Sequence, residues 1–76
     1  MSLHRGIVID TADPAGSGRL RVEVPDVSTE SMWAPTLIPL GVIDLQLPAV
    51  GTGVWVDFES DDFSSPVVLG LIAPTP

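Results

Sequence analysis

The segment Gly18-Arg19-Leu20-Arg21-Val22-Glu23-Val24-Pro25 decides the fold class, because its apolar and charged side chains alternate. Three aliphatic side chains fall on one side of an extended chain and three charged ones on the other, namely Leu20, Val22 and Val24 against Arg19, Arg21 and Glu23. A period of two is the pattern of a β-strand with one buried and one solvated face. Since proline cannot donate a hydrogen bond to a sheet, Pro25 is expected to end this strand.

Four further segments have the composition of β-strands: residues 3–9, 33–37, 54–59 and 67–72. Pro35 interrupts the second of these, which indicates an edge strand or a bulge. A cluster of Asp, Gly and Ser at 10–18 and a hairpin at 60–65 supply the turns. The long connection at 38–47 is broken by Pro39 and Gly41, too irregular for a helix and too apolar for a solvated linker. We expect it to be ordered and packed.

Five strands, a long connection between the third and fourth and a closing hairpin fit an all-β protein, a five-stranded Greek-key barrel of the OB type. We expect the barrel to span residues 1–72. The last four residues, Ala73-Pro74-Thr75-Pro76, are expected to form a short Pro-rich tail that cannot extend a sheet.

Composition limits how this chain is stabilised and what it binds. A domain of 76 residues buries only roughly 60 to 65% of the surface of its unfolded chain, and the absence of cysteine excludes disulfides, so we expect help from self-association. Three arginines, no lysine and ten carboxylates give a net charge of −7, which disfavours nucleic acid as a partner. No apolar segment approaches the roughly 20 residues that span a bilayer, so no stable membrane anchor is expected. We expect synthesis and assembly in the cytoplasm.

No group of residues has the pattern of a catalytic or metal site. His4 is the only histidine and has no nucleophile beside it in the sequence. The acidic group Asp57, Glu59, Asp61 and Asp62 lacks the glycine and bidentate glutamate of a calcium loop. The Gly-Ser-Gly sequence at 16–18 precedes a strand instead of a helix, so it is not a phosphate loop. The expectation is a protein without enzymatic activity, cofactor or metal.

Trp55 is the strongest candidate for an interface residue. It alternates with Val54, Val56 and Phe58, and if those three fill the barrel the indole lies outside, where aromatics are enriched at protein interfaces. The alternative is that Trp55 is buried under the connection at 38–47. The same outward surface is predicted to include Val68 and Ile72, and Arg19 and Arg21 are predicted to pair with carboxylates on a neighbouring strand or subunit.

The motifs also carry a family resemblance when they are taken in order. They are Gly6-Ile7-Val8, the segment at 18–25, Trp33, Leu47-Pro48-Ala49-Val50-Gly51, Val54-Trp55-Val56-Asp57-Phe58 and Pro66-Val67-Val68-Leu69-Gly70. This order resembles the OB-fold domain of phage tail-spike proteins of the tail-lysozyme type and of the Vgr proteins of type VI secretion.

The resemblance implies a homotrimer in the baseplate hub or central spike of a contractile phage tail, virion or related injection or secretion machine. Its implied partners are copies of itself, a ring-shaped hub protein and a separate spike or needle-tip protein, because this chain has no residues for a puncturing domain. The alternative is a free-standing OB-type module that binds an oligosaccharide or an oligonucleotide, which the fold alone suggests.

Overall fold

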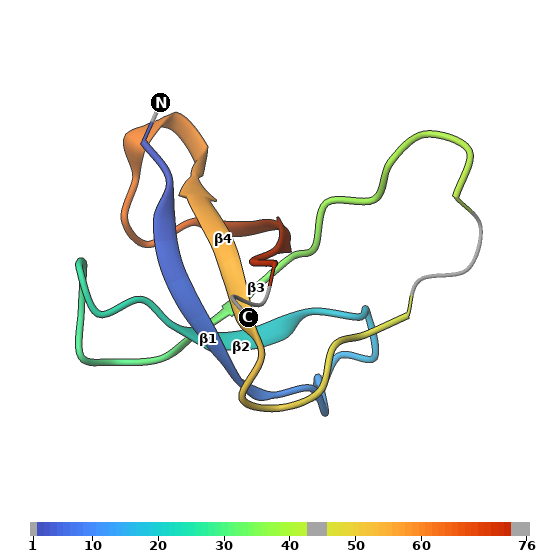
Figure 1. Ribbon diagram of the computed structural model, residues 1–76. Helices are drawn as coiled ribbons and strands as arrows, with labels where there is room; N and C mark the ends of the chain where they lie inside the picture. The colour runs from blue at the N-terminus through green and yellow to red at the C-terminus, as the bar shows by residue number, and fades with distance from the viewer. Residues whose placement is uncertain (1, 43–45, 74–76) are drawn as a thin grey trace.

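The computed structural model describes residues 2–42 and 46–73, which form one curled antiparallel sheet of five strands (Figure 1). The strands are β1 (His4–Asp10), β2 (Leu20–Glu23), β3 (Met32–Ala34), β4 (Gly53–Phe58) and β5 (Pro66–Leu71), in the sheet order β3-β2-β1-β4-β5. The OB-type fold predicted from the sequence is confirmed, with strand boundaries that differ by one to three residues. Of the predicted tail, residues 74–76 lie outside the described part.

The sheet curls until its two ends meet just after β3. Thr36 forms a parallel bridge with Val68, the Val68 amide donates to the Pro35 carbonyl at 2.9 Å, and the Leu37 amide donates to the Val68 carbonyl at 2.9 Å. Pro35 has no amide hydrogen to give to β2, so the chain can leave that strand there while its carbonyl pairs with β5. The predicted irregularity at Pro35 is therefore the point at which the barrel closes.

The core lies on the concave side of the sheet and consists of aliphatic side chains from all five strands, plus one aromatic ring. Its members are Val8, Leu20, Val22, Val24, Ala34, Val54, Val56, Phe58 and Val68. Val27 and Met32 pack against it from the side. Every second residue of β2 and of β4 points into this core, as the alternation predicts.

A β-bulge in β5 corrects the predicted placement of Val68. Val56 pairs with Val68 and Trp55 with Gly70, so Leu69 has no partner on β4. One extra residue reverses the side on which all later residues lie. Val68 therefore points into the core with 2% of its surface exposed, whereas Ile72 lies on the outer face. The prediction that both residues share an outward surface is wrong for Val68.

The connection between β3 and β4 also differs from the prediction. Residues 43–45 lie outside the described part, but Leu37, Ile38, Leu40, Val42 and Leu47 are all exposed. Figure 1 shows the chain after β3 running away from the barrel before it returns toward β4. The described residues of this connection are thus not packed as expected, and they form a projecting apolar segment.

The hairpin between β4 and β5 contains η1 (Glu59–Asp61), a three-residue 3-10 helix. Ser60 and Asp61 have positive φ values of 51° and 57°. The Asp62 carboxylate accepts hydrogen bonds from the Ser64 hydroxyl at 2.7 Å and the Ser64 amide at 2.9 Å, which lowers the pKa of Asp62. Asp62 therefore holds the turn. Within the described ranges, no helix has the length and hydropathy to cross a membrane.

Candidate interaction surface

Trp55 lies on the outer face of β4 and stacks with a residue that the sequence analysis did not single out. It pairs across the sheet with Arg5 of β1, whose guanidinium carbon lies 4.9 Å from the centre of the indole ring. Arg5 is exposed and Trp55 is half-buried. A cation over an indole at the surface contributes about 0.5–1 kcal/mol. Trp and Arg are also the side chains most enriched at the energetic centres of interfaces.

A second cluster of the same composition lies on the outer face of β2 and β3. Trp33 pairs with Arg21, and the guanidinium carbons of Arg19 and Arg21 lie 5.7 Å and 5.8 Å from the centre of its ring. The Arg21 Nε also donates a 2.6 Å hydrogen bond to the Ser31 hydroxyl. All three arginines of the chain therefore contact a tryptophan.

Arg19 has a carboxylate partner, but in the loop before its own strand. Its Nη2 lies 2.8 Å from Oδ1 of Asp13 and its Nε lies 3.1 Å from Oδ2. The same carboxylate accepts hydrogen bonds from the Ser17 hydroxyl at 2.7 Å and the Ala15 amide at 3.0 Å. Asp13 thus organises the turn that leads into β2, and Arg19 is used within the chain instead of on a neighbouring strand or subunit.

The contact with Arg19 holds the pKa of Asp13 well below its ordinary value of 3.8, and the hydrogen bonds from Ser17 and Ala15 act in the same direction. A carboxyl whose pKa is lower in the folded state adds stability above its unfolded pKa and loses it as the pH falls. Asp13→Asn is therefore expected to lower the urea midpoint at pH 7 and to weaken its decline below about pH 4. Asp61→Asn removes the same charge from an exposed residue and serves as the control. An unchanged acid decline in Asp13→Asn would contradict this role.

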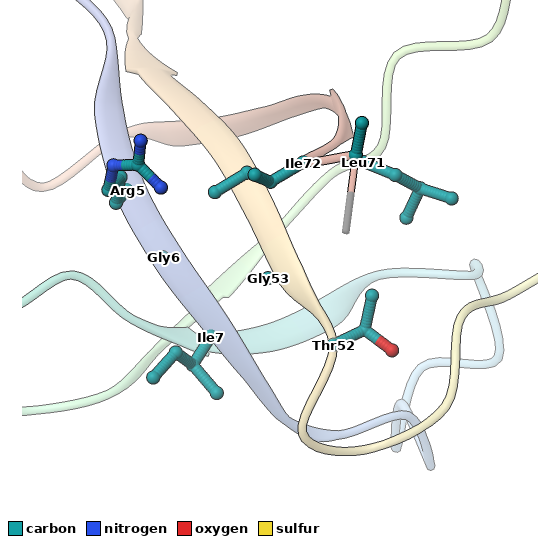
Figure 2. A pocket seen from close by; sticks show the side chains of 8 residues that line it. Arg5, Gly6, Ile7, Thr52, Gly53, Leu71 and Ile72 are labelled. Atoms are coloured by element: carbon teal, nitrogen blue, oxygen red, sulfur yellow. The ribbon is translucent and has the colours of Figure 1, made fainter. Parts of the chain in front are cut away.

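An apolar groove opens on the outer face beside the first cluster. It is a hollow of about 790 Å³ lined by Arg5, Gly6, Ile7, Thr52, Gly53, Leu71, Ile72 and Ala73. Figure 2 shows Ile7 and Leu71 on either side of the β4 ribbon, with Ile72 between them. Gly53 leaves room for Ile72, whose Cδ1 lies 3.4 Å from the point that a Cβ on this glycine would occupy. We refer to this hollow as the apolar groove.

A second hollow lies beneath the projecting connection and shares one lining residue with the apolar groove. That hollow measures about 430 Å³, and its lining includes Leu37, Leu47 and Leu69. Leu71 lines both hollows. Together with the exposed connection they form an apolar area on a strongly acidic molecule.

His4 packs as a structural residue. Its ring makes edge contacts with Phe58 and Phe63, at centroid distances of 5.4 Å and 6.3 Å, and its Nδ1 lies 3.7 Å from the Asp26 carboxylate. Among the residues that the structure describes, no three His, Asp or Glu side chains gather in a way that could hold a metal ion.

The sequence-predicted interface residues thus separate into three places. Trp55 and Ile72 lie on the outer face near the apolar groove, Arg19 and Arg21 surround Trp33, and Val68 is in the core. Sequence reasoning missed Arg5 and Ile7. The alternation of exposed and buried residues along β1 could have identified them, because Arg5 and Ile7 point to the side opposite the buried Gly6 and Val8.

Comparison with known proteins gives one family. A family model described as the type VI secretion system/phage-baseplate injector OB domain matches residues 4–72, from the first residue of β1 to the residue after β5. No curated protein matches the chain.

Proposed function

Because the chain belongs to the family of type VI secretion system and phage-baseplate injector OB domains, we propose that it is a non-enzymatic subunit of the baseplate hub or central spike. It trimerises and docks between a ring-shaped hub protein and a needle tip formed by another polypeptide. A structural role in the baseplate is what the family supports; trimerisation, both docking partners and the place in a virion or secretion apparatus are parts of the proposal.

The observation that carries the proposal is the amount of apolar side chain left in solvent. The exposed large hydrophobic residues are Leu3, Ile7, Ile9, Leu37, Ile38, Leu40, Val42, Leu47, Val50, Phe63 and Leu71. Single exposed aliphatic residues are ordinary, but contiguous apolar areas on a soluble domain mark sites of association. The apolar groove and the projecting connection form such an area.

The fold suits a component that transmits axial force. A sheet that closes on itself through Thr36 and Val68 leaves little free edge for unwanted pairing and resists unravelling from its ends. Its outer wall is then available for packing around a symmetry axis. This task needs shape and rigidity, not a catalytic group.

Binding to the hub tests the proposal directly. The chain is co-expressed with a ring-shaped hub protein from the same genome, and the purified complex is weighed by native mass spectrometry. We expect three copies of the chain per hub ring. A chain that fails to co-purify with the hub, or binds it as a single copy, would contradict the proposed role.

Trp55→Ala is expected to weaken this assembly. Loss of a central indole from an interface typically costs about 2 kcal/mol, or roughly thirtyfold in affinity. Because Trp55 is half-buried on the outer face, the urea midpoint should change much less than the affinity for the hub. Thr29→Ala alters an exposed residue away from this face and serves as the control. Equal affinities for the two variants would remove Trp55 from the interface.

One observation favours the alternative, a free-standing binding module. Trp33 with Arg19 and Arg21 lies on β2 and β3, the strands through which OB folds commonly bind single strands and sugars. Against it, Arg19 is held by Asp13, and the net charge of −7 repels phosphate. Titration with oligonucleotides and cell-wall fragments, followed by tryptophan fluorescence, separates the two functions.

A further inference from the structure

We propose that residues 37–42 of one copy, here called the arm, lie in the apolar groove of the next copy, so that a repeated arm-in-groove contact closes the ring of subunits. The inference deepens the proposed trimer by naming the two surfaces that meet. It rests on that function, and its test has an outcome in which the trimer survives and this contact does not.

The arm has a shape that suits insertion into a partner. Leu37, Ile38, Leu40 and Val42 are exposed, and Leu40 is fully so. The segment turns at Gly41, where φ is +89°, and the Val42 amide donates to the Pro39 carbonyl at 3.2 Å. A segment that is already folded into a turn loses less conformational entropy on binding than a flexible one.

The groove is an apolar hollow that the described residues of its own chain leave open. Among the described residues that line it, Arg5 alone is charged, and its guanidinium stacks on Trp55. The arm leaves the barrel at the junction of β3 and β5 and extends away from it (Figure 1), whereas the groove lies over β1 and β4 (Figure 2). Leu37, where the arm begins, lines the second hollow, which shares Leu71 with the groove, whereas Leu40 is fully exposed and can reach the groove of another copy.

Charge determines where two such copies can approach. Each carries a net charge of −7, so most of their surfaces repel one another. Residues 35–42 contain no ionisable side chain, and the one charge in the groove is positive. The arm and the groove are thus a pair of surfaces at which acidic copies meet without opposing carboxylates.

The kind of contact favours a second copy of this chain as the occupant. The arm and the groove are different surfaces, so one arm in one groove is a head-to-tail contact, which closes into a ring where the rotation between copies divides a full turn and otherwise gives an open filament. In a ring every arm and every groove is covered. A hub protein that instead covered the arm would leave the groove open, and this is an outcome that the test detects.

Cysteine cross-linking tests the contact without background, because the chain contains no cysteine. Leu40→Cys places a thiol on the arm and Ile7→Cys places one in the groove. Both side chains are exposed, so the fold should be retained, and equal urea midpoints for the variants and the parent chain verify this. The double variant and each single variant are treated with a short bismaleimide, alone and with the hub protein, and separated under denaturing conditions.

We expect most of the double variant to migrate as cross-linked dimers and trimers, with no species larger than a trimer. Each single variant should remain mostly monomeric. Cross-linking of Leu40→Cys alone would show arms that meet at an axis and would overturn the contact. Self-association without cross-linking of the double variant would also overturn it, while leaving the proposed trimer and its docking to the hub intact. A monomer under all conditions would overturn both.

Discussion

Leu20→Ala is expected to lower the free energy of unfolding by about 2–5 kcal/mol, because it removes buried methyl groups and leaves a cavity in the core. Leu20 is 0% exposed and packs among valines from both halves of the sheet. A chain of 76 residues has a total stability of roughly 4–11 kcal/mol, so the substitution removes from about a fifth of that stability to all of it. Urea unfolding, followed by the fluorescence of the two tryptophans, measures the change.

Leu3→Ala is the matched control, since the same atoms are removed from an exposed residue outside the arm and the groove. It should cost less than about 1 kcal/mol. Both variants are measured at one protomer concentration, because self-association adds to apparent stability. Similar losses for Leu20→Ala and Leu3→Ala would contradict the core described here.

Gly6→Ala is expected to lower the free energy of unfolding by about 1–3 kcal/mol, the cost of forcing an extra methyl group into a packed core. A Cβ at this position would lie 3.0 Å from Cγ2 of Val56 and 3.2 Å from the Glu23 carbonyl oxygen. The carbonyl belongs to the β2 backbone, so it cannot move without disturbing the pairing of β1 with β2. Chemical denaturation at fixed concentration measures the loss.

Gly70→Ala makes the same change on β5, where a Cβ would meet nothing within 4 Å. Alanine also restricts the unfolded chain, so this variant should be neutral or more stable by about 0.4–1 kcal/mol. Gly6→Ala should therefore lower the free energy of unfolding, whereas Gly70→Ala should leave it unchanged or raise it. If Gly6→Ala is as stable as Gly70→Ala, then β1 does not approach β4 and β2 as closely as described.

The strands could be predicted because alternation is a local signal. In β2, periodicity alone predicts that Val22 is in the core, whereas in β4 it separates Val56 from Trp55 and the structure shows that the face with Val56 is the buried one. The OB-type closure was predicted from the number of strands and from the resemblance. Pro35 was correctly singled out as an irregularity, although only the structure shows that its carbonyl joins β5.

The bulge in β5 could not be predicted from its sequence. Residues 67–72 are apolar on both faces, so no alternation indicates which side chains point inward. An unpaired Leu69 is set by how β5 fits β4 and the end of β3, and that fit is tertiary. Val68 was therefore assigned to the wrong face, whereas Ile72 was assigned to the right one.

The connection after β3 was mispredicted for a different reason. The apolar composition of Ile38, Leu40 and Val42 predicts burial within the chain. In the structure these side chains are exposed. Apolar composition therefore indicates that a segment is buried against something, but not whether that is its own barrel or another molecule. A single sequence does not separate a segment that packs on its own barrel from one that packs on a neighbour.

The most direct test of self-association through the outer surface is sedimentation equilibrium of the chain alone, at concentrations up to the millimolar range. The account predicts a molar mass that rises from 8.0 kDa and levels off at three times that value. A mass that stays at 8.0 kDa throughout would contradict it, because the exposed groove and arm would then lack the partner on which the assembly depends.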